Sequence, residues 1–208
     1  MEAVKDLLKS GLSELGIVPD EKIVDALLFY LSELKRWNKA YNLTAITDDR
    51  EIVAKHFLDS LLYLKALPMS ARNLCDVGSG AGFPGLPIAL VRPNLPITLI
   101  EPSRKRCAFL RNLSKRLALH NVDIIEAVAE EVGELRFDAV LTRATFSIAE
   151  LMRKADHLLA ERGAFILSKG EKAKEELLQV PEGFQVKTLS LMLPDTDMER
   201  TLIIATRR

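Results

Sequence analysis

The stretch DVGSGAGFPG, at positions 76–85, gathers four glycines behind an aspartate. Glycine has no Cβ, so a loop of this composition lets a ligand approach the main chain closely. The aspartate adds a carboxylate at the point where a preceding strand would end. These residue types predict a small-molecule site, and the spacing indicates which ligand it takes.

Two glycine fingerprints can be counted in this loop. From Gly80, G-A-G-F-P-G has the G-x-G-x-x-G form of a dinucleotide-binding turn, and from Asp76, D-V-G-S-G-A-G has the form found in class I S-adenosylmethionine-dependent methyltransferases. Both place the ligand at the carboxyl end of the first strand, against a helix N-terminus. Both also expect an acid at the end of the second strand to hold ribose hydroxyls, and Glu101, 19 residues after Gly82, has that position.

The position of the loop relative to the strand favours S-adenosylmethionine. A count from Gly80 puts an acid and a further glycine inside the strand, whereas a count from Gly78 leaves LCDV as the strand and GSGAG as the turn. A carboxylate would repel a pyrophosphate but not a sulfonium and an amino group. The expected cofactor-binding residues are therefore Asp76, Gly78, Gly80, Gly82 and Glu101. Two structural alternatives stay open: Asp76 caps the glycine turn, or Glu101 is an exposed N-cap of the next helix.

The elements that position this loop alternate between strands and helices from about residue 72 onward. Strands are expected at 73–77, 96–101, 122–127, 137–144 and 163–170, with helices near 84–92, 103–119 and 148–160 and a short charged helix after 170. Residues 184–193 and 200–208 are expected to form a terminal hairpin. This alternation predicts an α/β protein with a mostly parallel, Rossmann-like sheet of the class I methyltransferase type and an antiparallel C-terminal hairpin.

Residues 1–67 are expected to be helical, because apolar residues recur at spacings of three and four, apart from one step of five between Ile52 and Phe57. One stripe contains Ile23, Leu27, Leu31 and Leu34, and a second contains Ile52, Phe57, Leu61 and Leu64. Thr47 or Asp48 is the expected N-cap between them. We therefore divide the chain into an N-terminal helical region, 1–67, and a cofactor-binding catalytic domain, 68–208.

Composition excludes several classes of protein. The 208 residues are 48% hydrophobic and 28% charged with zero net charge, as in soluble globular proteins. The charged N-terminus argues against a signal peptide, and no apolar run reaches the roughly 18–20 residues that cross a bilayer. Cys75 and Cys107 lie in apolar patterns without metal-ligand spacing. We expect a reduced, cytoplasmic protein without a metal site or membrane contact.

Several segments together resemble one bacterial family. WNKAYNLTAI, HFLDSL, DVGSGAGFPGLPIAL, RKRCAFL, TRA and LSKG follow one another, from about residue 30 to 170, as in the ribosomal RNA small subunit methyltransferase G family, also called glucose-inhibited division protein B. The resemblance implies methylation of N7 of a guanine in 16S ribosomal RNA, with S-adenosylmethionine as donor. It implies cofactor contacts at Gly78, Phe83, Ala129, Glu130 and Arg143. The expected partner is 16S ribosomal RNA or a small ribosomal subunit particle, and the expected oligomeric state is a monomer.

The residues after the fourth strand agree with an N7 acceptor. Methylation of an exocyclic amine usually uses an Asn/Asp-Pro-Pro-aromatic cluster there, but this chain has TRATF. Methylation of a pyrimidine carbon needs a nucleophilic cysteine, and neither Cys75 nor Cys107 is suitably placed. Guanine N7 carries a free lone pair, so alignment alone supplies most of the acceleration. An NAD(P)-dependent oxidoreductase and a noncatalytic RNA-binding module are the alternative functions.

Arg143 and Lys169 are the expected catalytic positioning residues, acting neither as acid nor as base. Arg143 would hold a carboxylate, a phosphate or guanine O6, and Lys169 a phosphate or a base. The structural alternatives are a salt bridge at the strand end and a solvated lysine. Phe146 is either a stacking partner for the base or a core residue.

Two basic segments are candidates for RNA contact. On a helix from Arg104, Arg111 and Lys115 fall within about 20° of Arg104. Cys107, Leu110, Leu113 and Leu117 lie on the opposite, apolar side of that helix. The second segment mixes cations with aromatics, as sites for looped RNA do; it contains Lys35, Arg36, Trp37, Lys39 and Tyr41. In each case the alternative is structural: a solvated face, or a helix end anchored by Trp37.

Three further polar residues lie in segments that carry the family resemblance. They are Asn42, His56 and Asp59, and we expect their helical region to close over the cofactor pocket and shape the RNA entrance. No individual role follows from the sequence. His56 is expected to be a packing histidine, since transfer to N7 requires no base.

Overall fold

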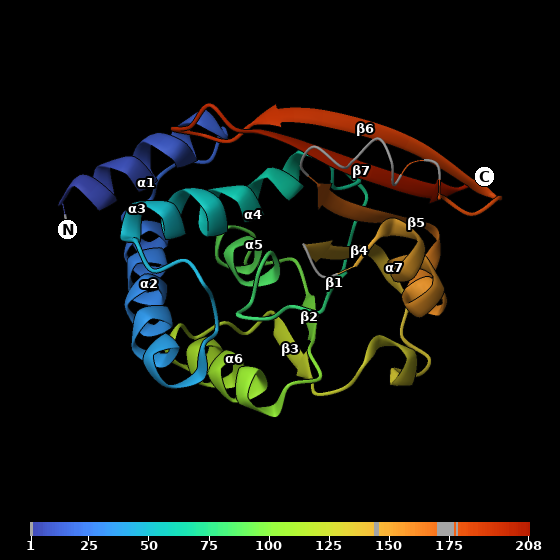
Figure 1. The fold of residues 1–208 in the computed structure, drawn as a ribbon, viewed down its shortest axis with the longest axis horizontal. Coiled ribbons are helices and arrows are strands. Elements are labelled where there is room, and N and C mark those ends of the chain that lie inside the picture. The colour runs from blue at the N-terminus through green and yellow to red at the C-terminus, as the bar shows by residue number, and fades with distance from the viewer. Residues whose placement is uncertain (1, 144–145, 170–176, 178) are drawn as a thin grey trace.

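The computed structural model describes residues 2–143, 146–169, 177 and 179–208, and its centre is a seven-stranded sheet (Figure 1). The strands are β1 (Leu74–Val77), β2 (Ile97–Ile100), β3 (Val122–Ile125), β4 (Phe137–Arg143), β5 (Leu159–Lys169), β6 (Phe184–Met192) and β7 (Glu199–Arg207). Their order is β3-β2-β1-β4-β5-β7-β6. The first five run parallel, and β7 is antiparallel to both β5 and β6. The predicted parallel sheet with an antiparallel hairpin at its edge is confirmed.

The strand order reverses between β1 and β4. From β1 the chain passes through α5 (Gly85–Val91) to β2 and through α6 (Arg104–Arg116) to β3, and it then returns to the other side of β1. In open α/β sheets the crevice at such a reversal, beyond the carboxyl ends of the strands, is where ligands bind. The glycine loop follows β1, and Arg143 is the last residue of β4, so both lie at this reversal.

The N-terminal region is helical, as predicted. It contains α1 (Glu2–Glu14), α2 (Glu21–Tyr41) and a longer helical segment. That segment consists of α3 (Asp49–Ile52), a π-helical turn (Val53–Leu58), α4 (Asp59–Leu61) and a 3₁₀ turn (Leu62–Lys65). Asp48, and not Thr47, is the N-cap of α3, because its Oδ1 accepts a hydrogen bond from Glu51 N at 3.0 Å.

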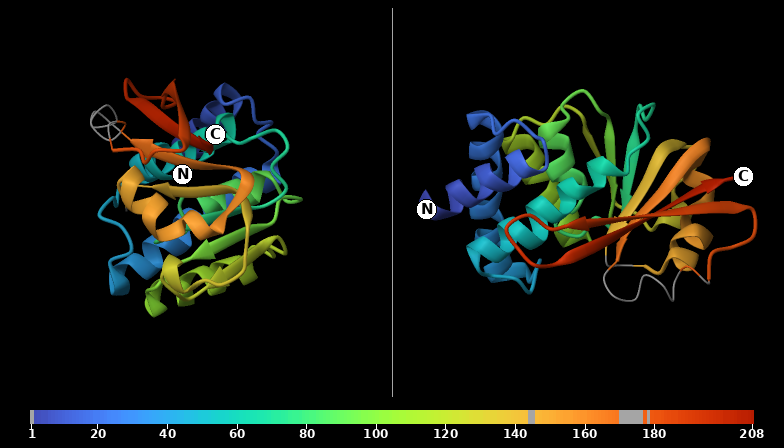
Figure 2. Two further views of the ribbon diagram at one scale, coloured as in Figure 1. Left: turned by 90° about the vertical axis from the view of Figure 1, so that its right-hand side faces the viewer. Right: turned by 90° about the horizontal axis from the view of Figure 1, so that it is seen from above.

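The N-terminal helices share one hydrophobic core with one face of the sheet. Both predicted stripes are buried except for Ile23 and Leu64 at their ends, which are partly buried. Tyr30 and Phe57 pack in the same cluster as Phe109 of α6. The other face is covered by α7 (Ile148–Ala155), and Figure 2 places α7 and the N-terminal helices on opposite sides of the molecule.

Side-chain alternation along β4 decides where the functional arginine points. Leu141 belongs to the cluster with the N-terminal helices, whereas Val140 belongs to the cluster with α7. Successive side chains of a strand point to opposite faces. Arg143, two residues after Leu141, therefore emerges toward the N-terminal helices.

Some element boundaries differ from the prediction. The helix from Arg104 ends at Arg116 instead of 119, shortly before Ala118 takes a positive φ of 51°. The helix expected through 160 ends at Ala155, because β5 already pairs with Phe137 at Leu159, before a register shift near Gly163. The charged helix expected after 170 lies outside the described residues. Within the described part of the chain, no helix is long and apolar enough to cross a membrane.

Candidate active site

The main chain of the glycine loop forms one wall of a cavity of about 170 Å³. The lining residues are Leu43, Thr44, His56, Gly78, Ser79, Gly80, Ala81, Phe83, Arg106 and Arg143. Gly78 and Gly80 have φ values of 71° and 59°, in the left-handed region that favours glycine. A Cβ on Gly80 would meet nothing closer than Gly78 O at 3.9 Å, so this position opens toward the cavity.

Gly82 and Asp76 face the protein interior and do not line this cavity, so their contact with the cofactor stays a prediction. A Cβ on Gly82 would lie 2.6 Å from Leu86 Cδ1 and 2.8 Å from Tyr30 Oη, so close packing requires this glycine. Asp76 is fully buried, and its Oδ2 accepts a hydrogen bond from Gly85 N at 2.8 Å. Burial raises the pKa of Asp76 to about 7, and its Oδ1 has no hydrogen-bond partner among the described residues. Its observed contact is that of the capping alternative, at the start of α5.

Glu101 ties the second strand to the glycine loop. Its carboxylate accepts hydrogen bonds from Gly80 N at 2.8 Å and from Ser103 N at 2.9 Å. Glu101 is 2% exposed, so it is not the exposed residue that the N-cap alternative requires. The N-cap of α6 is Ser103, whose backbone N–H donates to Glu101. Ribose binding by this carboxylate stays a prediction.

Ala129 and Glu130 lie in a 3₁₀ turn, Ala129–Glu131, after β3. Ala129 is buried in the cluster beneath α7, and Glu130 forms an exposed ion pair with Lys154 of α7. Neither lines the cavity at the glycine loop. Their predicted contact with the adenine end of the cofactor stays a prediction.

Arg143 joins the strand end to the N-terminal helices. Its Nη1 donates to Lys55 O at 2.8 Å and lies 3.3 Å from Asp59 Oδ2, and its Nη2 lies 3.0 Å from His56 Nδ1. The guanidinium carbon also lies 5.0 Å from the centroid of the Phe83 ring. The salt bridge expected as the structural alternative is thus present, on a side chain that also lines the cavity.

His56 is held as a neutral imidazole. Arginine is only a donor, so Nδ1 accepts from Arg143 and the proton lies on Nε2, which donates to Thr44 Oγ1 at 2.8 Å. Burial, followed by the positive charge of Arg143, lowers the pKa of His56 to about 3. The ring stacks on Phe83 with centroids 4.6 Å apart. The predicted packing role agrees with these contacts.

A second cavity, of about 330 Å³, adjoins the first and shares Arg143 and His56 with it. Its lining residues are Ile46, Lys55, His56, Asp59, Arg143, Ser168, Lys169 and Arg200. Asp59 is 4% exposed and holds two cations, since Arg200 Nε donates to its Oδ1 at 2.7 Å while Arg143 faces Oδ2. Lys169 Nζ donates to Phe146 O at 2.5 Å, and Phe146 itself packs against the cluster beneath α7.

Arg200 and Tyr63 are site residues that the sequence analysis did not single out. Tyr63 Oη donates to Thr142 O at 2.6 Å and accepts from Ser168 N at 2.9 Å, so it joins the ends of β4 and β5 beside Arg143 and Lys169. For Arg200, the alternation of side chains along the last strand is a signal in the sequence, because it places Arg200 on the same face as the buried Leu202.

The two basic segments have different outcomes. On α6, Arg104, Arg111 and Lys115 are exposed opposite buried Cys107, as predicted, and Arg111 pairs with Glu126 at 2.8 Å. In the second segment Trp37 packs edge-on against Phe109, with centroids 5.6 Å apart, so the anchor alternative describes it. Among the described residues, no cluster of His, Cys, Asp and Glu could hold a metal ion.

The sheet order, the reversal between β1 and β4 and the glycine loop after β1 define a class I methyltransferase fold. Solved methyltransferases share it: a Pyrococcus furiosus methyltransferase matches with a TM-score of 0.62 at 16% identity, over 88% of this chain and 98% of its own. TrmN from Thermus thermophilus matches with a TM-score of 0.59 at 17% identity, over 84% of this chain and 53% of its own. At these identities the likeness concerns the fold alone.

Sequence comparison gives the family. The model of GidB, rRNA small subunit methyltransferase G, matches residues 23–202. A ribosomal RNA small subunit methyltransferase G from Neisseria meningitidis serogroup B is 37% identical over 205 residues, 98% of this chain and 99% of the relative. That of Pelotomaculum thermopropionicum is 37% identical over 216 aligned positions, 98% of this chain and 90% of the relative. The chain belongs to the rRNA small subunit methyltransferase G family.

Proposed function

We propose that this protein transfers the methyl group of S-adenosylmethionine to N7 of a guanine in 16S ribosomal RNA. The observation that carries the proposal is the pair of adjoining cavities that share Arg143 and His56 at the strand-order reversal. One is walled by bare main chain, as a cofactor site requires, and the other is rich in hydrogen-bond donors. Family membership indicates which donor and acceptor they take.

The residues present fit the cofactor. A Cβ on Gly80 would project into the first cavity, which is the kind of close approach that the loop glycines permit. Gly78, Gly80, Phe83 and Arg143 would hold the cofactor there, Glu101 its ribose, and Ala129 with Glu130 its adenine end. When bound, S-adenosylmethionine supplies an electrophilic methyl group on a positively charged sulfur.

The second cavity suits a guanine whose N7 must stay free. Arg143, Lys169 and Arg200 are donors without acceptor atoms, and guanine offers O6 beside N7 in the same plane. A donor on O6 would orient the base while leaving the N7 lone pair available. Alignment of this kind supplies a large part of the rate enhancement in a bimolecular transfer.

The charges around the cavity also suit the reaction. Methyl transfer moves positive charge from sulfur onto the purine, so nearby cations oppose it. The Asp59 carboxylate between Arg143 and Arg200 offsets part of their charge, and neutral His56 adds none. N7 loses no proton on methylation, so the low pKa of His56 is no obstacle.

Two other functions are less favoured. An oxidoreductase would need a dinucleotide in the first cavity, and a noncatalytic module would bind RNA without transfer; family membership favours neither.

A ribosomal RNA substrate would also place the protein in the cytoplasm, and we propose that it acts there as a monomer.

The test uses purified protein, labelled S-adenosylmethionine and 16S ribosomal RNA from cells lacking this protein, both naked and in small subunits. We expect label in 7-methylguanosine after digestion to nucleosides. Binding of S-adenosylhomocysteine without any incorporation into either substrate would favour the noncatalytic module. Binding of NADH in place of S-adenosylhomocysteine would favour the oxidoreductase.

A further inference from the structure

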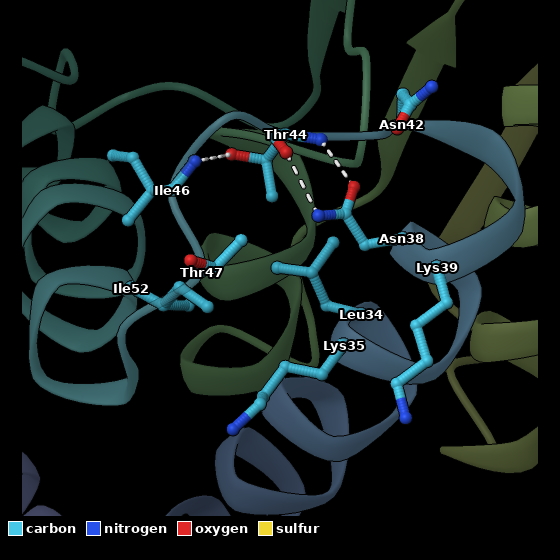
Figure 3. Close-up of a pocket in the computed structure, with 9 residues that line it drawn as sticks. All are labelled: Leu34, Lys35, Asn38, Lys39, Asn42, Thr44, Ile46, Thr47 and Ile52. Carbon is cyan, nitrogen blue, oxygen red and sulfur yellow. Dashed lines mark hydrogen bonds between the residues drawn. The ribbon is translucent and has the colours of Figure 1, made fainter.

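A third cavity, of about 330 Å³, lies between the end of α2 and the start of α3 (Figure 3). It is lined by Leu34, Lys35, Asn38, Lys39, Asn42, Thr44, Ile46, Thr47 and Ile52. The volume falls in the range of about 300–1,000 Å³ that small-molecule sites have. Neither the cofactor nor the target guanine needs this cavity in the proposed function.

The lining combines the surfaces that a nucleotide recognises. Ile46 gives an apolar, partly exposed surface against which the flat face of a base could pack, and the fully buried Leu34 and Ile52 lie behind it. Asn42 and Thr47 add exposed polar side chains at the rim. Unpaired bases are read in this way, with their faces on apolar or aromatic groups and their edges on polar ones.

The positive charge of the rim lies on α2. Lys35 and Lys39 are one helical turn apart and extend from the same side of α2 (Figure 3). Lys35 forms an ion pair with Asp49, whereas Lys39 forms no ion pair within the described part of the chain. Lys39 can therefore bind a phosphate without breaking an ion pair within the described residues.

The wall of this cavity is shared with the active site. Thr44 lines both the third cavity and the glycine-loop cavity, and Ile46 lines both the third cavity and the Arg143–Arg200 cavity. The segment is rigidly held: Asn38 donates to Thr44 O and accepts from Thr44 N, both at 2.9 Å, and Thr44 meets His56. A nucleotide bound in this cavity would thus lie beside both active-site cavities.

We propose that this cavity binds an unpaired nucleotide of the substrate RNA next to the target guanine, with its base against Ile46 and its phosphate on Lys39. The proposal rests on the proposed function for the identity of the RNA. It assigns the α2–α3 loop a role in substrate binding. It gives the second basic segment one RNA-contacting cation, Lys39, since Lys35 and Arg36 are paired internally.

The test compares four variants with the wild-type protein. Lys39→Ala removes the cation and Lys39→Arg keeps it, while Thr47→Trp places a bulky side chain at the rim of the cavity. Lys22→Ala removes an exposed lysine from the opposite end of the same helix as a matched control. The probes are naked 16S ribosomal RNA and small ribosomal subunits, both from cells lacking this protein. Affinity is measured as a function of salt, together with kcat and KM for methyl transfer and affinity for S-adenosylhomocysteine.

We expect Lys39→Ala to weaken RNA binding roughly fivefold and to lower the salt slope by about 0.7, as loss of one phosphate contact on a single strand does. Thr47→Trp should weaken RNA binding about tenfold, the scale of one lost base contact. Both losses should appear in KM for RNA and not in kcat, with affinity for S-adenosylhomocysteine unchanged. Lys39→Arg should restore binding.

Three outcomes would overturn the proposal. Lys39→Ala and Thr47→Trp could bind RNA as tightly as Lys22→Ala does. They could bind naked RNA normally and lose affinity only for the assembled subunit, which would indicate a ribosomal protein as the occupant. Lys39→Ala could fail to change the salt slope. If instead the wild-type protein binds RNA but transfers no methyl group, the proposed function fails while the binding data still decide on the cavity.

Discussion

Two positions of the loop after β1 require glycine for different physical reasons, and substitutions can distinguish these reasons. Gly80 opens toward the cavity, whereas Gly82 packs against Leu86 and Tyr30. Asparagine tolerates the left-handed conformation of Gly80, where φ is 59°. We expect Gly80→Asn to change the free energy of unfolding by less than about 1 kcal/mol and to weaken binding of S-adenosylhomocysteine at least tenfold or so.

Gly82→Ala is the contrasting variant. Its Cβ would overlap buried atoms at a φ of 97°, so we expect a loss of about 3 kcal/mol in the free energy of unfolding. Chemical denaturation measures the free energy of unfolding of both variants, and titration calorimetry measures their affinity for S-adenosylhomocysteine. Normal cofactor affinity in Gly80→Asn would show that the ligand does not approach this main chain.

His56 predicts a dependence of stability on pH. Burial and Arg143 lower its pKa in the folded protein to about 3 from an ordinary value of 6.5. Between these values the unfolded chain binds a proton that the folded chain does not. The contribution of the neutral ring is thus present above pH 6.5 and is lost as the pH falls toward 3.

Denaturation of the wild-type protein and of His56→Gln, from pH 8 to pH 4, measures this contribution. The stability difference between wild type and variant should shrink as the pH falls below about 6.5. Asp76, with its pKa raised to about 7, contributes to the pH dependence of stability with the opposite sign. It is present in both proteins, so its contribution cancels in their stability difference. A difference that stays constant over this range would contradict the buried, neutral histidine.

At the scale of elements, the π-helical turn Val53–Leu58 brings the N-terminal helices into the site. It carries His56, leads directly into Asp59 and leaves Lys55 O to accept from Arg143. Such turns are often found at functional sites because they change the direction of a helix face locally. The turn is thus what lets one helical segment reach both cavities.

Tyr63 fixes this segment to the sheet. It is fully buried, and its hydroxyl bonds main-chain groups at the ends of β4 and β5. We expect Tyr63→Phe to cost about 2 kcal/mol, because Thr142 O and Ser168 N would lose a buried partner. Tyr41→Phe is the matched control, since Tyr41 is 44% exposed. Equal stability of the two variants by chemical denaturation would contradict the bridging role.

Local patterns in the sequence predict the elements well but not the contacts between them. Spacings of three and four identify the stripe of α2, and the count from Gly78 identifies the turn after β1. Arg200 meets Asp59 across 141 positions and Tyr63 meets Ser168 across 105, so no local period indicates either contact. The motif also does not reveal which members of the loop face inward, as Asp76 and Gly82 do.

The π-helical turn is a similar case. The stripe from Ile52 to Leu64 steps by five, four and three residues, and the step of five spans the turn. The stripe as a whole predicts a helix there, and the long step matches the i to i+5 hydrogen bonds of a π-helix. The spacing does not indicate the contacts that the turn makes, which are the packing of Phe57 beneath Tyr30, with ring centroids 5.1 Å apart, and the hydrogen bond from Arg143 to Lys55 O. Both contacts depend on the assembled fold.

At the scale of the whole molecule, one hydrophobic cluster extends from α1 through α2 to α5 and α6. The N-terminal helices therefore contribute both to the core and to the walls of all three cavities. We propose that the helical region, 1–67, and the catalytic domain, 68–208, work as one unit, in which the helices close the donor site and form the entrance for RNA.

A crystal structure with S-adenosylhomocysteine would show where the methyl donor binds. We expect the cofactor product to lie against the main chain of Gly78 and Gly80, with its sulfur directed toward His56 and Arg143, which line both cavities. Density for the product at another edge of the sheet, or against the α7 face with the glycine loop closed, would contradict it.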